Sequence, residues 1–248
     1  MCCFSRKVDV VADTNIFARS SKDGRQFLVY SMRYKAGEDL SMILPIPVPK
    51  ASKEDAVKFI NLEKYDDFFA DLRKGFPEEP TKSAPPASRG GIKLDKPKLV
   101  VVEVGSFIAS FVPSVKDFAR LDEKFRLPTA IWDKLPQYKD WGFAVFQLKK
   151  DQSKVHPMAF EFPRANTKQL FFPTVHIHDG TVPTKAAFDH TLFCQATEGE
   201  DMMEWKESPQ PAALFMTKLK EAQGIVSGNA HCYRKVMVGK YDNKDVIV

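Results

Sequence analysis

Histidine clustering is the strongest chemical signal in the sequence. His176 and His178 occupy alternate positions of one apolar run, and His190 opens the next run along the chain. In an extended strand, alternate side chains share a face. If the two runs pair as a hairpin, His190 lies opposite His178, with Cβ atoms about 5 Å apart. The spacing therefore predicts three imidazoles on one face of a hairpin.

Three neutral imidazoles with an open coordination position are typical of Zn²⁺ or another divalent transition metal. We expect Asp179 or Asp189 to orient one imidazole from behind. A metal-dependent, hydrolase-like enzyme with His176, His178 and His190 as ligands is therefore one hypothesis for function. Structural histidines and metal-free acid–base chemistry are the alternatives, because a one-residue slip in register would turn one ring to the other face.

The start of the chain suggests a different chemistry. Met1 is followed by Cys2 and Cys3. Loss of Met1 would leave the Cys2 thiol beside a free α-amino group, whose pKa of about 8 suits it as a base. N-terminal nucleophile amidohydrolases use this arrangement, with Asp13 or Arg19 as candidate substrate contacts here. A pair of adjacent cysteines is equally consistent with a metal clip or a terminus without function.

Other common signatures are absent from the sequence. It contains no P-loop, no G-x-G-x-x-G, no G-x-S-x-G, no H-E-x-x-H and no C-x-x-C. The net charge is only +5, and basic and acidic residues are mixed, whereas nucleic-acid binders concentrate Lys and Arg on one face. No apolar run reaches the ~20 residues that a membrane span needs. We therefore expect neither a nucleic-acid nor a membrane partner.

The N-terminal residues lack the pattern of a secretory signal, which predicts a cytoplasmic protein. In a reducing compartment, the four cysteines are thiols or metal ligands and not disulfides.

Strand-like and helix-like segments come in blocks. Residues 8–48 alternate as strands do, and Asp23-Gly24 marks a hairpin turn. Helical spacing of apolar residues occurs at 52–75, 114–125, 128–135 and 209–223. Further strand patterns lie at 98–112, 141–195 and 230–238, where His156 shares a face with apolar residues and is expected in the core. This pattern predicts an α+β fold with mostly antiparallel sheet and three to five helices.

Residues 77–97 are rich in proline and poor in large apolar side chains, which predicts an exposed loop. The 248 residues are expected to form a single globular α+β domain, 1–248. A two-lobe split at this loop is the alternative.

Several short motifs resemble a bacterial domain family of unknown function. The resemblance runs from Phe4 to about His178 and covers most of the chain. Its motifs are the cysteine-bearing start, Leu44-Pro-Ile-Pro47, Val104-Gly-Ser-Phe107, Tyr138 with Trp141-Gly-Phe143, and Val155 to Phe162. The chain departs from the family in lacking an export signal and in having adjacent cysteines. The resemblance supports the fold and implies no activity.

Taken together, these patterns favour a non-catalytic binding or scaffold protein with a protein partner, which we expect to expose a large apolar surface patch. The metal-dependent enzyme and the Cys2 amidohydrolase are the two alternatives.

Overall fold

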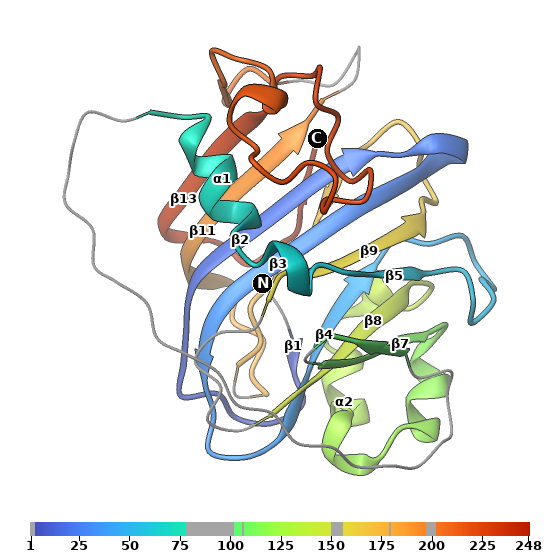
Figure 1. Ribbon diagram of the computed structural model, residues 1–248. Coiled ribbons are helices and arrows are strands. Elements are labelled where there is room, and N and C mark those ends of the chain that lie inside the picture. The colour runs from blue at the N-terminus through green and yellow to red at the C-terminus, as the bar shows by residue number, and fades with distance from the viewer. Residues whose placement is uncertain (1–2, 78–101, 106, 150–155, 179, 197–201) are drawn as a thin grey trace.

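The computed structural model describes residues 3–77, 102–105, 107–149, 156–178, 180–196 and 202–248. Within these ranges, most strands belong to two sheets (Figure 1). The larger sheet runs, in order, β12 (Lys206–Glu207), β13 (Tyr233–Asp242), β11 (Lys185–Gln195), β2 (Val10–Ser20), β3 (Arg25–Lys35), β9 (Met158–Pro163) and β5 (Lys58–Asn61). The smaller runs β1 (Cys3–Phe4), β4 (Leu40–Ile46), β8 (Gly142–Leu148), β7 (Phe107–Val112) and β6 (Val102–Val104). A short pair, β10 (Phe171–Phe172) with β14 (Val246–Ile247), forms a separate two-stranded sheet.

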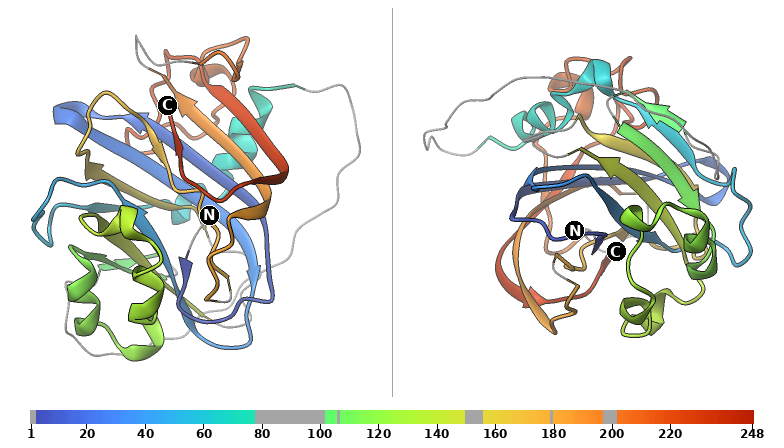
Figure 2. Two further views of the ribbon diagram at one scale, coloured as in Figure 1. Left: turned by 180° about the vertical axis from the view of Figure 1, so that it is seen from behind. Right: turned by 90° about the horizontal axis from the view of Figure 1, so that it is seen from below.

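Helical segments in the described residues are short. They are α1 (Phe68–Lys74), α2 (Thr129–Trp132) and the 3₁₀ turns η1 (Lys22–Gly24), η2 (Glu63–Tyr65), η3 (Val115–Arg120), η4 (Glu123–Phe125), η5 (Pro136–Tyr138) and η6 (Ala212–Leu214). The green segment between β7 and β8, which contains α2, gathers at one side of the molecule (Figure 2). No helix in the described part of the chain is long and apolar enough to cross a membrane.

Strand alternation divides the core into two layers. In β3, Leu28 and Tyr30 pack in the layer between the two sheets, while Val29 between them faces the other side. In β11, Leu192 and Phe193 divide in the same way. This two-residue period is the one that an extended backbone imposes. The larger sheet is therefore covered on both faces, by the smaller sheet on one and by α1 with the 212–232 segment on the other.

A buried carboxylate fixes α1 on this second face. Asp71 accepts hydrogen bonds from the Tyr65 hydroxyl at 2.8 Å, from the Thr217 backbone N–H at 2.9 Å and from the Thr217 hydroxyl at 2.6 Å. Lys74 adds an ion pair at 2.6 Å. Burial alone would raise the pKa of Asp71, but these hydrogen bonds outweigh it and lower that pKa to about 2. The carboxylate thus joins α1 to the segment that contains Thr217.

The far end of α1 is tied to β2. One guanidinium nitrogen of Arg73 lies 2.7 Å from the Asp13 carboxylate and 2.7 Å from the Asn15 side-chain oxygen. Asp13 has a φ of 53°, at the point where the register between β2 and β3 shifts. The bulge therefore turns polar groups of β2 toward the helix.

The predicted hairpin at Asp23-Gly24 is confirmed. Ser20 pairs with Gln26 across β2 and β3, and both turn residues have positive φ, 55° for Asp23 and 70° for Gly24. This is the conformation that Asp-Gly favours. The Pro-rich loop predicted at 77–97 lies outside the described residues, apart from Pro77.

The α+β prediction with three to five helices is wrong: the described residues form a mainly β structure. Its longer α-helix, α1, has seven residues, and α2 has four. Residues 114–125, where a helix was expected, form the two 3₁₀ turns η3 and η4. Their apolar residues Val115, Phe118 and Leu121 are three apart, which is the repeat of a 3₁₀ turn as well as a neighbour spacing on an α-helix.

The helix expected at 209–223 is interrupted for a different reason. Met216 bonds back to Ala212, and Ala222 bonds back to Lys218, as in a helix. Between them, the Thr217 N–H donates instead to the Asp71 carboxylate. A tertiary hydrogen bond thus breaks the helical ladder at its centre, which no local pattern reveals.

Replacing Asp71 by asparagine tests this anchor. We expect Asp71→Asn to lower the free energy of unfolding by about 2–4 kcal/mol, because buried donors on Tyr65 and Thr217 lose their anionic acceptor. Asp67→Asn is the matched control, since its carboxylate is 61% exposed and 4.0 Å from Lys218; we expect it within about 0.5 kcal/mol of wild type. Urea denaturation followed by circular dichroism measures both, and equal losses would contradict the role of Asp71.

Candidate functional site

The histidine-bearing segment 174–178 lies between residues 4–8 on one side and residues 243–245 on the other. On one side, Phe4 N–H donates to the Ile177 carbonyl at 3.1 Å, and Val8 N–H donates to the His178 carbonyl at 3.3 Å. On the other side, Asn243 bonds to both backbone groups of His176: its side-chain oxygen accepts from the N–H at 2.6 Å, and its amide donates to the carbonyl at 3.0 Å. The backbone of the segment is therefore fixed from both sides.

Asp245 completes this attachment. Its carboxylate accepts from the N–H groups of Thr174 and Val175, at 2.8 and 3.2 Å, and from the Tyr138 hydroxyl at 2.6 Å. Burial raises the pKa of Asp245, and these hydrogen bonds act in the opposite direction. A short C-terminal stretch thus determines where the two histidines of the segment lie.

Four rings pack together, with His176, Phe188 and His190 in a triangle and His178 against His176; we call this group the histidine row. The ring centroids of His176 and His178 are 5.1 Å apart, and those of His176 and His190 are 4.9 Å apart. Phe188 lies 4.6 Å from His176 and 4.9 Å from His190. The three predicted histidines therefore do come together, with His176 in the middle.

The hairpin that was expected to bring them together is wrong. β11, which carries His190, pairs with β13 on one side and with β2 on the other, so the 174–178 segment does not pair with it. Outside named strands, Ile177 makes a parallel bridge to Cys3. The rings meet through packing of separate layers and not through strand register.

The expected supporting carboxylates are not used as predicted. The Asp189 carboxylate accepts from the Asp13 N–H at 2.8 Å. It is the backbone N–H of Asp189 that contacts an imidazole, donating to Nδ1 of His190 at 3.2 Å. Because Nδ1 accepts, the proton of the neutral ring belongs on Nε2. Asp179, the other candidate, lies outside the described residues.

Burial keeps the imidazoles of His176 and His190 neutral. It lowers the pKa of His176 to about 2, with a smaller contribution from His178. Burial also lowers the pKa of His190, strongly. The Nε2 atoms of both rings are buried and have no hydrogen-bond partner in the structure. Such atoms are rare in folded proteins and call for a ligand, an ordered water or a structural reason.

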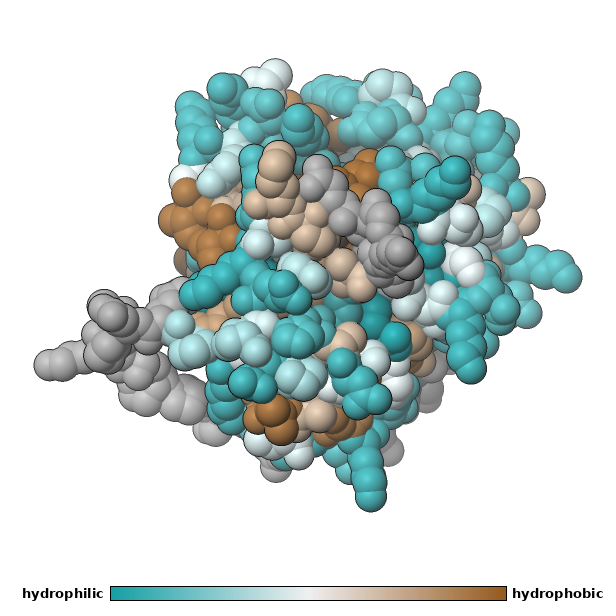
Figure 3. Space-filling model, turned by 90° about the horizontal axis from the view of Figure 1, so that it is seen from above, coloured by the Kyte–Doolittle hydropathy of each residue, from teal (hydrophilic) through white to brown (hydrophobic). Residues whose placement is uncertain are grey.

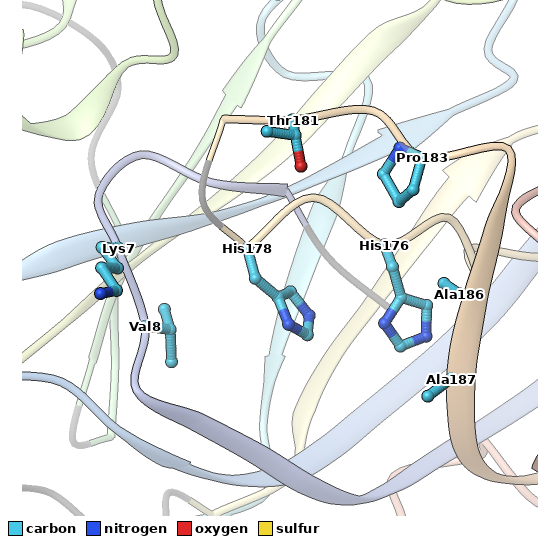
Figure 4. Close-up of a pocket in the computed structure, with 8 residues that line it drawn as sticks. All are labelled: Lys7, Val8, His176, His178, Thr181, Pro183, Ala186 and Ala187. Atoms are coloured by element: carbon cyan, nitrogen blue, oxygen red, sulfur yellow. The ribbon is translucent and has the colours of Figure 1, made fainter.

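A hollow of about 410 Å³ opens beside the row. Figure 4 shows the His176 and His178 rings hanging side by side from their segment, on the same side of it. The other residues that line the hollow are Lys7, Val8, Thr181, Pro183, Ala186 and Ala187. Sequence reasoning missed these six, because a lysine and five small or aliphatic residues from separate segments give no spacing signal.

The other predicted site residues are not brought together with the row. Cys2 lies outside the described residues, so the amidohydrolase alternative stays a prediction. Its expected helpers are held elsewhere: Asp13 bonds to Arg73, and Arg19 donates to the Ile225 carbonyl at 2.6 Å. His156 is buried, as predicted, and packs on Phe107 with ring centroids 4.5 Å apart.

The face of the molecule in Figure 3 is largely hydrophilic, with separate apolar patches. Val236 and Val238 are 50% and 66% exposed, and they share a face of β13. On the outer side of β13, β12 pairs with only Tyr233 and Arg234. Exposed apolar side chains and an edge without a described partner strand beyond Arg234 therefore coincide on β13.

These observations define a two-sheet, mainly antiparallel β protein with a histidine-lined hollow. Its sequence matches no family model and no curated protein. Its fold is similar to that of a mutated baculovirus P35 after caspase cleavage, at 17% identity and a TM-score of 0.51, over 97% of this chain and 98% of that chain. A further structure of baculovirus P35 matches at 14% identity and a TM-score of 0.46, over 97% and 96% of the two chains. The caspase-8/P35 complex matches at 15% identity and 0.44, over 95% of each chain.

At these identities the likeness shows the fold alone. It agrees with the β-rich architecture that replaces the α+β prediction. The resemblance to a bacterial domain family of unknown function stays a prediction.

The buried imidazoles predict a pH-dependent stability in protein treated with EDTA. Because the folded pKa of His176 lies below its ordinary value of 6.5, the unfolded chain binds more protons below pH 6.5. The contribution of these histidines to the free energy of unfolding is therefore fully present above pH 6.5. Below pH 6.5 the free energy of unfolding falls, by up to about 1.4 kcal/mol per pH unit for each such histidine. Urea denaturation between pH 7 and 5 measures this slope.

Two variants assign the slope. His176→Phe keeps an aromatic ring in the row. It should reduce the slope by the contribution of one proton, up to about 1.4 kcal/mol per pH unit. His231→Phe, which changes a ring outside the row that is 41% exposed, is the matched control. An unaltered slope in His176→Phe would contradict the assignment.

Proposed function

We propose that this chain is a non-catalytic protein-binding protein whose partner is a protease of the caspase class. The observation that carries the proposal is the end-to-end likeness to P35 after caspase cleavage, in which 97% of this chain aligns with 98% of that chain. The alignment spans nearly the whole of both chains, so the proposal rests on the fold as a whole and not on one element. We therefore infer that this chain presents the same kind of β scaffold to a protease.

Features of this chain agree with a binding role. α1 is joined to the segment that contains Thr217 through Asp71, and to β2 of the larger sheet through Arg73. Three residues after Lys74, the Pro-rich run that begins at Pro77 continues the chain. Binding residues are disproportionately found on connecting segments that a rigid scaffold positions. The anchored helix thus fixes the position of the chain just before this run. We propose that the run contacts the protease.

An inhibition assay tests the proposal. Purified chain is mixed with an active caspase, and the rate of hydrolysis of a small peptide substrate is measured against the chain's concentration. We expect the rate to fall to near zero at about one chain per protease active site, with the two proteins eluting together in size-exclusion chromatography. Full activity at a large molar excess of chain, without co-elution, would contradict the proposal.

The same mixtures locate the contact. We expect at most a single backbone cleavage, and the masses of the two fragments place the bond within the 77–97 run. A caspase alkylated at its active-site cysteine is the control, and should leave the chain intact. Cleavage at several sites without inhibition would show an ordinary substrate and would also contradict the proposal.

Loosening α1 should weaken the interaction. Arg73→Ala removes hydrogen bonds to Asp13 and Asn15. Together these contribute about 1 kcal/mol or more to holding α1 against β2. We expect affinity for the protease to fall by up to about tenfold, which corresponds to 1.4 kcal/mol. Arg33→Ala is the matched control, because Arg33 is 65% exposed and 3.9 Å from the same Asp13 carboxylate. Equal affinities of the two variants would show that α1 does not position the contact.

A further inference from the structure

The hollow beside the histidine row has the features of an incomplete metal centre. We propose that His176 and His178 form a two-imidazole chelate for a divalent transition metal such as Zn²⁺, with the remaining coordination positions open to the hollow. This inference does not depend on binding of a protease.

The spacing of the two rings suits a shared metal. A Zn–N bond is about 2.0–2.1 Å, so each ring centroid lies about 3 Å from a bound zinc, and two imidazoles at a tetrahedral angle have centroids about 5 Å apart. The observed separation between His176 and His178 is 5.1 Å. Both rings line the hollow and extend to the same side of their segment (Figure 4).

The backbone holds the pair ready. Asn243 occupies both backbone groups of His176, and Val8 N–H donates to the His178 carbonyl. The two Cα positions are therefore fixed before any ligand binds, so binding orders only the side chains. A site whose supporting contacts are already formed loses less entropy on binding.

The chemistry of His176 favours a metal over a charged ligand. Its Nε2 is buried without a hydrogen-bond partner. A neutral imidazole offers a lone pair, which is the ligand form that Zn²⁺, Ni²⁺ and Cu²⁺ bind. Coordination would satisfy an atom that otherwise carries a desolvation cost.

His190 is placed as a neighbour and not as a third ligand. Its Nδ1 accepts from the Asp189 N–H, which leaves the proton on Nε2, so this atom is a donor. In agreement, the described His, Cys, Asp and Glu residues include no group of three or more arranged to hold a metal ion. Water, or a side chain from another molecule that enters the hollow, would fill the open positions.

Equilibrium dialysis against Zn²⁺ tests the site, using full-length, tag-free chain stripped with EDTA. We expect one Zn²⁺ per chain, and His176→Gln and His178→Gln each to weaken binding by more than about tenfold, a change of 1.4 kcal/mol. His231→Gln, which alters a ring elsewhere on the surface, should bind as wild type does. Far-UV circular dichroism in EDTA checks that all variants remain folded.

The outcomes are decisive in both directions. Unchanged affinity in His190→Phe supports the two-histidine chelate. A loss in His190→Phe equal to that in His178→Gln would overturn it in favour of a three-histidine centre. Absence of stoichiometric zinc, or equal binding by wild type and both glutamine variants, would overturn the site altogether.

Discussion

Burial of both faces of the larger sheet is the constraint on which the rest of the structure depends. A strand with one solvated face can alternate apolar and polar residues, but β3 and β11 must be apolar on both sides. Leu28, Val29 and Tyr30 are all fully buried, although neighbours face opposite layers. Each layer then needs its own cover. The smaller sheet supplies one, and α1 with the 212–232 segment supplies the other.

The second cover is held by polar contacts as well as by apolar packing. α1 is a short helix of seven residues, and isolated helices of that length are not stable in water. Asp71 and Arg73 compensate by joining it to Thr217 and to the bulge in β2. A carboxylate buried among so many donors is specific in a way that apolar contacts are not, because it fixes the orientation of the helix as well as its depth.

Local signals determined what the sequence could predict. Asp23-Gly24 marks its turn because the conformation depends on those two residues, and His156 was placed in the core by alternation with apolar neighbours. The proximity of His176, His178 and His190 was also foreseen, but for an incorrect reason, since the expected hairpin does not form. Long-range contacts explain the failures. Thr217 leaves a helical ladder for Asp71, and Asn243 and Asp245 position the histidine segment from the far end of the described chain.

The attachment of His176 to Asn243 joins residues that are 67 positions apart. Contacts of such long sequence separation form late, because the entropy of closing the intervening chain has to be overcome first. On the ribosome, the segment at 174–178 has no partner on that side until residues 243–245 have been synthesised and have left the exit tunnel. The hollow therefore acquires its shape only after residues 243–245 have bonded to the segment at 174–178, when both sheets have most of their strands available for pairing.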